Sequence, residues 1–264
     1  MKKNNKRTVH YQKLKNVKNI VLMFIVPAAL VLLWHFLSKA EVFPALLRPN
    51  LATLWKGFLQ NLNSGILFKD ISSSLLIEVK GYLIGAGLGF LLGMAMGYFK
   101  TIHQLLAPVL NCLRQIPPLA WIPLLILWFG ISDVSMVTLI VLSSFFPVLL
   151  NTINGIQEVP AGYLELSKNY QIKKKDVFFK ILLPGAAPSI FVGLRLGAGT
   201  AWMSIVAAEM VAATAGVGYR INDSRNLMRT DLVLVYMIVI ALIGGLIDFG
   251  IRKLAQRISA WQRK

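Results

Sequence analysis

The stretch GYLIGAGLGFLLGMAMG, residues 81–97, contains no charged side chain and has a glycine at every fourth position. The recurring glycines are Gly81, Gly85, Gly89, Gly93 and Gly97. A four-residue spacing places them on one face of a helix, where a second helix can approach closely in lipid. We therefore expect a membrane-spanning helix over about 71–99 that uses this glycine stripe for helix packing. Direct lining of a transport pathway is the alternative role for the stripe.

The remainder of the chain is similarly apolar. Of its 264 residues, 56% are hydrophobic, and the mean hydropathy of +0.64 exceeds that of an ordinary soluble domain. Because about 20 apolar residues cross the hydrocarbon core of a bilayer, this length allows about six spans with their loops. We predict an all-α, polytopic transmembrane helical bundle. The other expected spans are 19–39, the proline-interrupted segment 101–130, 133–156, 186–212 and 231–251.

The charged residues are clustered, and their positions predict the topology. The net charge is +17, but Lys and Arg lie between apolar runs, so a membrane explains them better than a nucleic acid does. Basic residues gather in three segments, 1–18, 157–185 and 255–264. Because such residues favour the cytoplasmic side, both termini are expected in the cytoplasm of a bacterial cell, with 40–70 and 213–230 outside its plasma membrane. The arginines of 213–230 depart from this rule, and Asp223 and Asp231 are expected to offset them.

The N-terminal segment has the basic start and apolar run of a secretion signal. The run over about 19–40 is longer than the core of a signal peptide, and no small-residue cleavage site follows it, so we expect a retained first span. After it, Trp55 and Phe58 lie on a short amphipathic stretch, which we place on the outer surface of the membrane.

The sequence contains no readable catalytic or metal-binding constellation. Cys112 is the single cysteine, and the three histidines have no ligand spacing. The phosphate-binding pattern G-x-x-x-x-G-K-[ST] is absent. We expect no metal, no cofactor, no enzymatic activity and no energy source in this chain itself.

Residues 157–185 form a long charged stretch between two predicted spans. The segment 163–168 consists of good helix formers, and 177–183 is apolar enough to require burial. Pro184 then ends the segment before the next span. Exposed Leu and Phe side chains on the cytoplasmic side favour contact with either the membrane surface or a protein partner.

The spacing within this loop resembles the EAA loop of permeases of binding-protein-dependent ABC transporters. The family pattern is E-A-A, three residues, G, nine residues and I-x-L-P. The residues that match it at the correct distances are Glu165, Ile181, Leu183 and Pro184. We refer to residues 157–185 as the coupling loop.

Three positions of the coupling loop depart from the family pattern. Leu166 and Ser167 stand where the two alanines would be, and Gln171 stands where the glycine would be. The family glycine assists the turn between two short helices, so Gln171 must make this turn without the backbone freedom of glycine.

The resemblance covers about residues 70–254 and is closest to the subfamily that serves nitrate, sulfonates and taurine. The segments that carry it are 113–124, 128–130, 145–147, 193–195, 201–202 and 207–210. It implies an ABC transmembrane type-1 (MetI-like) permease domain over 71–254. It also implies two separate ATPase subunits that each hold one coupling loop, an extracytoplasmic substrate-binding protein, and a second permease copy, most simply a homodimer in the lipid membrane.

Two kinds of position within the spans are candidates for the translocation pathway. An ionisable group at bilayer depth costs about 3 kcal/mol or more, and helices broken by proline are frequent near substrate paths in transporters. The candidates are Arg114, Pro117, Trp121, Arg195, Trp202 and Glu209. A structural ion pair or an interhelical polar contact is the alternative for Arg195 and Glu209. Arg114 is expected near the start of the third span.

Three further charged residues are expected at the ends of spans. Glu78 and Lys80 are placed at the outer end of the second span, and Asp248 is placed at the end of the sixth.

The sequence thus favours the permease subunit of an ABC importer over two alternatives. A self-contained secondary carrier would require inverted repeats and ion-coupling acids, and a channel or scaffold would leave the spacing of the coupling loop unexplained. The expected solute is a nitrate-, sulfonate- or taurine-like anion, or a pyrimidine precursor of thiamine.

Overall fold

The computed structural model describes residues 25, 29, 36 and 51–258. The predicted tail 1–18 lies outside the described residues, as do all but three positions of the predicted first span 19–39. The described part from residue 51 onward consists of helices and connecting turns, with no strand. The prediction of an all-α fold is therefore confirmed.

The helices follow one another closely along the chain. Their bounds are α2 Leu51–Asn63, α3 Ile66–Tyr98, α4 Lys100–Leu113, η2 Pro118–Trp121, α5 Ile122–Phe129, α6 Asp133–Gln157, α7 Ala161–Asn169, α8 Lys174–Val177, η3 Phe178–Leu182, α9 Leu183–Ala212, α10 Val217–Asn226 and α11 Thr230–Ile258. η2 is a 3-10 helix and η3 is a π-helical turn. α8, η3 and α9 join into one helix of 39 residues.

Four of these helices are long and apolar enough to cross a membrane: α3, α6, the joined helix Lys174–Ala212, and α11. A fifth span is possible if α4 and the η2–α5 segment count as one broken span, since they meet at an angle of 79°. The break lies between Leu113 and Pro118, and it is explained by the prolines at 117 and 118, which cannot continue a helix. The proline-interrupted third span of the sequence prediction corresponds to this bent pair.

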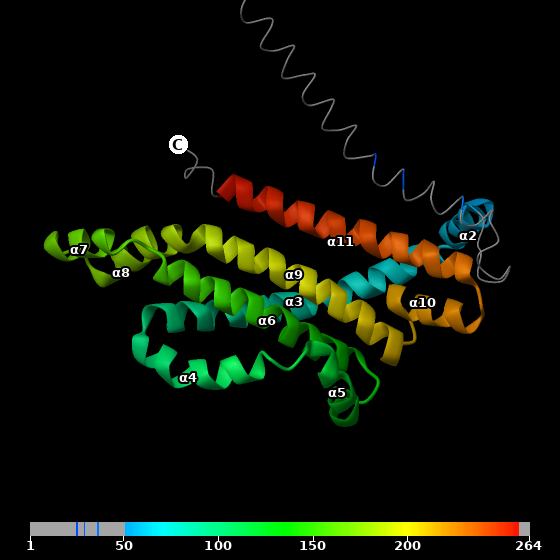
Figure 1. The fold of residues 1–264 in the computed structure, drawn as a ribbon, viewed down its shortest axis with the longest axis horizontal. Helices are drawn as coiled ribbons and strands as arrows, with labels where there is room; N and C mark the ends of the chain where they lie inside the picture. Colours follow the sequence, from blue (N-terminus) through cyan, green and yellow to red (C-terminus); the bar gives the residue numbers. More distant parts are fainter. Residues whose placement is uncertain (1–24, 26–28, 30–35, 37–50, 259–264) are drawn as a thin grey trace, which may run out of the picture.

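The long helices lie side by side and form an elongated bundle (Figure 1). α7 and α8 are at one end of the bundle, whereas α2 and α10 are at the other. α6 lies between α3 and α9 and packs extensively against both. Its central residues Leu139, Ile140, Val148 and Leu149 are completely buried and form much of the core.

The glycine stripe of α3 faces α6. A β-carbon on Gly81 would lie 2.6 Å from the β-carbon of Ile140, and one on Gly89 would lie 2.6 Å from the carbonyl oxygen of Phe145. One on Gly93 would lie 2.7 Å from the β-carbon of Thr152. Gly85 and Gly97 are equally close to α6. Only a glycine at these positions lets the two backbones approach this closely.

The structure corrects three placements made from the sequence. Because α3 begins at Ile66, Glu78 is buried more than three turns inside this helix and does not mark its outer end. Arg114 follows α4 and lies at the break before η2, not at the start of the third span. Asp248 lies well inside α11, which continues to Ile258.

A fourth correction concerns residues 213–230, which we expected to form a loop. They contain α10, a helix of 10 residues that begins after Gly216. Two glycines and three arginines in this segment concealed the helix, since glycine lowers helix propensity.

Candidate functional site

The coupling loop folds as two short helices joined by a tight turn. α7 follows Pro160, and its last turn leads to a residue in the left-handed conformation, Gln171, with φ of 51°. The backbone N–H of Ile172 donates to the carbonyl of Ser167 at 2.9 Å, and that of Gln171 donates to the carbonyl of Lys168 at 3.0 Å. This pair of bonds is the Schellman arrangement that commonly ends a helix, in which glycine is the preferred left-handed residue. Gln171 therefore adopts the left-handed conformation at the position where the family pattern has glycine.

One side of the coupling loop is anchored to the bundle. Leu182 is buried in a cluster with Ile156, Val159 and Ala186, and Ile181 and Leu183 pack against the same cluster. Pro184 closely follows the π-helical turn η3 inside the joined helix, so it does not end the helical segment as the sequence predicted. Ser167 is buried, and its hydroxyl donates to the carbonyl of Leu164 at 2.7 Å.

The coupling loop also exposes apolar side chains among its charged ones. Its large apolar residues exposed by more than half are Tyr163, Leu166, Tyr170 and Phe179. Glu165 is exposed beside Leu166. Patches of this composition are typical of surfaces that bind a partner. The loop thus presents exposed apolar and basic side chains on a folded segment at the end of the bundle.

The six pathway candidates do not gather at one site. Trp121 and Trp202 pack in the same hydrophobic cluster, and the indole Nε1 of Trp202 donates to the carbonyl of Ile240 at 3.1 Å. Arg114 and Pro117 are exposed at the break between α4 and η2. Arg195 and Glu209 both lie on α9, but 14 residues of helix separate them by roughly 21 Å.

Arg195 forms an ion pair with Asp248 of α11 through two contacts, one of them between Nη2 and Oδ2 at 2.9 Å. Both side chains remain almost half exposed. The contact is the interhelical ion pair that we considered as the alternative to a pathway role, and it ties α9 to α11.

Glu209 belongs to a buried hydrogen-bond network at the α10 end of the bundle. Its carboxylate accepts the Ser74 hydroxyl at 2.6 Å and the backbone N–H of Gly218 at 2.8 Å. The backbone N–H of Val217 in turn donates to Ser74 Oγ at 3.0 Å. These N–H groups belong to the first turn of α10 and have no partner within that helix. Glu209 and Ser74 therefore cap α10 from two other helices.

A second buried network lies one turn away on α3, and no pattern in the sequence indicates it. Asp70 is almost completely buried. It accepts Arg220 Nε at 3.0 Å and the Tyr236 hydroxyl at 2.8 Å. The bond to Asp70 raises the pKa of the Arg220 guanidinium above its usual value. Asp70, Arg220 and Tyr236 thus connect α3, α10 and α11 through a charge-assisted contact.

Two acid–base contacts expected from the sequence are present in the segment 213–231. Asp223 lies 3.4 Å from Nη1 of Arg220, and Asp231 lies 2.6 Å from Nη2 of Arg229. The acids therefore offset part of the positive charge at this end of the bundle.

Glu78 occupies the same face of α3 as Asp70 and Ser74, two turns and one turn further along. It is buried, and among the described residues it has no hydrogen-bond or ion-pair partner. An uncompensated acid in this position is costly, and no pattern in the sequence distinguishes it from an acid at the end of a span.

Comparison with known proteins agrees with the fold and the loop. The family model described as "Binding-protein-dependent transport system inner membrane component" matches residues 85–260. The chain is 37% identical to SsuC of Bacillus subtilis, which is assigned to aliphatic sulfonate transport, with 90% of this chain and 86% of that protein covered. It is 33% identical to the taurine transport system permease protein TauC of Escherichia coli, with 76% and 74% covered.

Solved structures show the same fold at low sequence identity. The chain superposes on a chain of the MetNI methionine ABC transporter in an inward-facing conformation, with a TM-score of 0.60 and 17% identity over 73% of this chain and 96% of that one. A chain of an amino acid ABC transporter gives a TM-score of 0.60 at 18% identity, over 77% and 97%. With its family model, its relatives and its MetI-like fold in agreement, the chain belongs to the binding-protein-dependent transport system inner membrane components, the permease subunits of ABC importers.

Proposed function

We propose that two copies of this chain form the translocation pathway of an importer that is driven by two separate ATPase subunits. The observation that carries this proposal is the coupling loop, which is anchored on one side by the Leu182 cluster and exposes apolar residues on the other. An ATPase subunit that holds Tyr163, Leu166 and Tyr170 would be joined through α8 directly to the span α9. Closure of two such subunits would then move both spans together.

The proposed orientation places the coupling loop in the cytoplasm and α10 outside. The C-terminal end of α11 lies toward the same end of the bundle as α7 and α8 (Figure 1). Lys168, Lys173, Lys174 and Lys175 are gathered at this end, which agrees with the preference of basic residues for the cytoplasmic side. The opposite end, with α2 and α10, would receive the substrate-binding protein.

The proposed solute is a small anion that carries a sulfonate or a similar oxyanion. The relatives named for aliphatic sulfonates, for taurine and for nitrate share this chemistry. Their identities of 33–37% over most of the chain support a related pathway.

Co-purification of the ATPase subunit tests the role of the coupling loop. Glu165→Lys and Leu166→Ala change the exposed side of α7 without removing a residue of the Leu182 cluster. We expect each to reduce ATPase co-purification and uptake at least fivefold while the chain still inserts into the membrane. Lys56→Glu, a charge reversal on exposed α2 at the opposite end, serves as the control and should leave co-purification unchanged. Normal co-purification and uptake in both coupling-loop variants would refute the proposal.

A further inference from the structure

A cavity of about 250 Å³ lies between α4 and α6, with Met96 of α3 also contributing to its wall. It lies in the half of the bundle nearer to the coupling loop, since Gln157 is the last residue of α6. Among its lining residues are four with polar side chains: His103, Asn111, Asn154 and Gln157. None of its lining residues is acidic.

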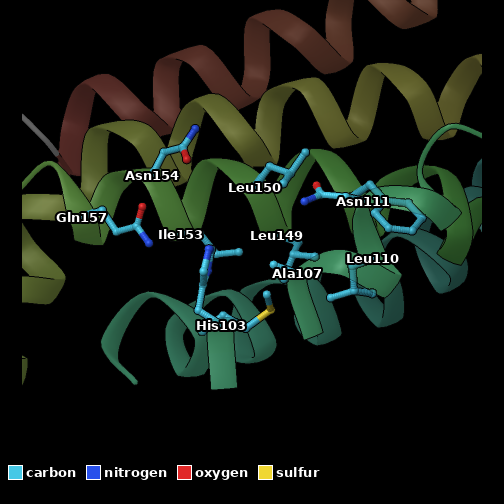
Figure 2. Close-up of a pocket in the computed structure, with 11 residues that line it drawn as sticks. His103, Ala107, Leu110, Asn111, Leu149, Leu150, Ile153, Asn154 and Gln157 are labelled. Carbon is cyan, nitrogen blue, oxygen red and sulfur yellow. The ribbon is translucent and has the colours of Figure 1, made fainter. Parts of the chain in front are cut away.

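The polar side chains of the lining are not all turned into the space between α4 and α6, since the Asn154 amide extends away from α4 (Figure 2). The His103 side chain extends from α4 toward α6, and the Gln157 amide extends toward the same space, while Asn111 lies at the other end of the cavity. His103 Nδ1 is buried and has no hydrogen-bond partner among the described residues. A buried polar atom without a partner is rare in proteins and indicates a missing water, ion or ligand.

The distribution of side chains around α4 shows that this polarity is confined to one face. Leu105, Val109 and Leu113 recur every four residues and are exposed on a different face of the helix from the cavity. A face of this kind suits lipid, whereas His103 and Asn111 would be costly there. In a membrane-spanning chain, such polar groups are expected to face a water-filled space.

The chemistry of the lining restricts what the space can hold. The amides of Asn111 and Gln157 and the imidazole of His103 supply N–H donors, and the lack of an acid removes the repulsion that an anion would meet. Along α4 these donors extend from His103 to Asn111, which is roughly 12 Å of helix rise. The cavity volume of about 250 Å³ is large enough for a small solute.

We propose that this cavity is a solute site of the translocation pathway, in which His103, Asn111 and Gln157 donate to the oxyanion of a small sulfonate-like anion. The inference rests on the proposed function, because it assumes that the chain transports a solute. It assigns the polar contact to α4 and α6, whereas the pathway candidates chosen from the sequence lie on α9 and in the segment 114–121 between α4 and α5.

Cysteine labelling of the full-length chain in its membrane complex tests this site. In a Cys112→Ser background, Asn111→Cys places a thiol in the cavity and Leu105→Cys places one on the exposed apolar face of α4. The probes are sulfonatoethyl methanethiosulfonate and its trimethylammonium analogue, and each rate is normalised to the reaction of the same reagent with free cysteine. We expect Asn111→Cys to react at least tenfold faster than Leu105→Cys, and to favour the sulfonate reagent at least threefold.

The anion preference should depend on the donors of the cavity. Adding His103→Leu or Gln157→Leu to Asn111→Cys should remove the preference for the sulfonate reagent, whereas Gln104→Leu, the neighbouring residue outside the cavity lining, should retain it. His103 and Gln157 lie on different helices, so the test remains valid if one of the two substitutions impairs folding. Co-purification of the ATPase subunit monitors the folding of each variant. Equal labelling of Asn111→Cys and Leu105→Cys, or a preference unaffected by both substitutions, would overturn the inference.

The two proposals fail in different ways. If the unmodified chain does not co-purify with an ATPase subunit and supports no uptake, the proposed function is wrong. If the complex assembles and transports but the cavity shows no anion preference, only the solute site is wrong.

Discussion

Gln171 holds a backbone conformation that glycine adopts more readily. A residue with a β-carbon in the left-handed region is strained by roughly 1–2 kcal/mol, and Gln171 has φ of 51° at the end of α7. The strain is tolerated because two backbone hydrogen bonds close the turn. The structure therefore explains how the coupling loop keeps the family turn without the family glycine.

A glycine at this turn should make the coupling loop more stable. We expect Gln171→Gly to relieve about 1 kcal/mol of strain and to slow tryptic cleavage at Lys173, Lys174 and Lys175. Asn169→Gly, two residues earlier in the helical part of α7, should lower the stability by about 1 kcal/mol instead and speed cleavage. Changes of the same sign in the two variants would contradict this account of the turn.

Ser74 is expected to contribute more to stability than its exposed neighbours on α3. Its hydroxyl donates to Glu209 and accepts from Val217, so Ser74→Ala would leave two buried groups short of a partner. We expect a loss of about 1–3 kcal/mol, measured as earlier thermal unfolding of the purified complex. Ser72→Ala is the matched control, because within the part of the chain that the structure describes Ser72 donates only to the carbonyl of Lys69 one turn earlier. Its effect should stay within about 0.5 kcal/mol.

Buried polar residues were the least predictable part of the site. Glu209 was identified as a candidate from its depth in a span, but its partners, Ser74 and Gly218, come from other segments and carry no sequence signal. Glu78 was assigned to the end of a span because charged residues usually lie there. Which acids are buried depends on tertiary contacts, and these cannot be deduced from spacing along one helix.

At the scale of elements, the contact between α3 and α6 depends on which glycines lie between the helices. A β-carbon on Gly89 would lie 2.6 Å from the Phe145 carbonyl oxygen, whereas one on Gly87 would meet nothing within 4 Å. The glycine stripe and Gly87 therefore lie on the same helix, but the stripe is packed against α6 and Gly87 faces open space.

Alanine substitutions on α3 should separate these two classes of glycine. Gly89→Ala must push the backbones apart, and we expect it to destabilise the chain by about 1–3 kcal/mol, as overpacking commonly does. Gly87→Ala should be neutral or stabilising by up to about 1 kcal/mol, because alanine favours the helix. Thermal unfolding in detergent measures both, and a loss of stability at Gly87 equal to that at Gly89 would contradict the packing role.

The sequence predicted the bounds of apolar membrane-spanning helices better than it predicted short polar helices. The spans over 133–156 and 231–251 agree with α6 and α11 to within a few residues at their N-terminal ends, because long apolar runs leave few alternatives. The break in the third span was visible in its prolines. α10 was missed because a short polar helix is stabilised by Glu209 and Asp70 of other helices and not by its own composition.

For the whole molecule, the arrangement in Figure 1 makes the topology testable. In a Cys112→Ser background, we expect Lys174→Cys in the coupling loop to react with a membrane-impermeant thiol reagent only from the cytoplasmic side. A cysteine in place of Arg225 on α10 should react only from outside, since this helix lies at the opposite end of the bundle. Labelling of Lys174→Cys in intact cells would reverse the proposed orientation.

The continuity of α8, η3 and α9 has a mechanical consequence for the whole molecule. A helix of 39 residues is roughly 58 Å long, and α6 packs along it from about Ala186 to Thr200. If a helix of this length tilts as one rigid body, its two ends are displaced in opposite directions. A push on the coupling loop would reach Glu209 and the first turn of α10 without any relay of side chains between them. A single tilt of the joined helix would then open the pathway at one face of the membrane and close it at the other.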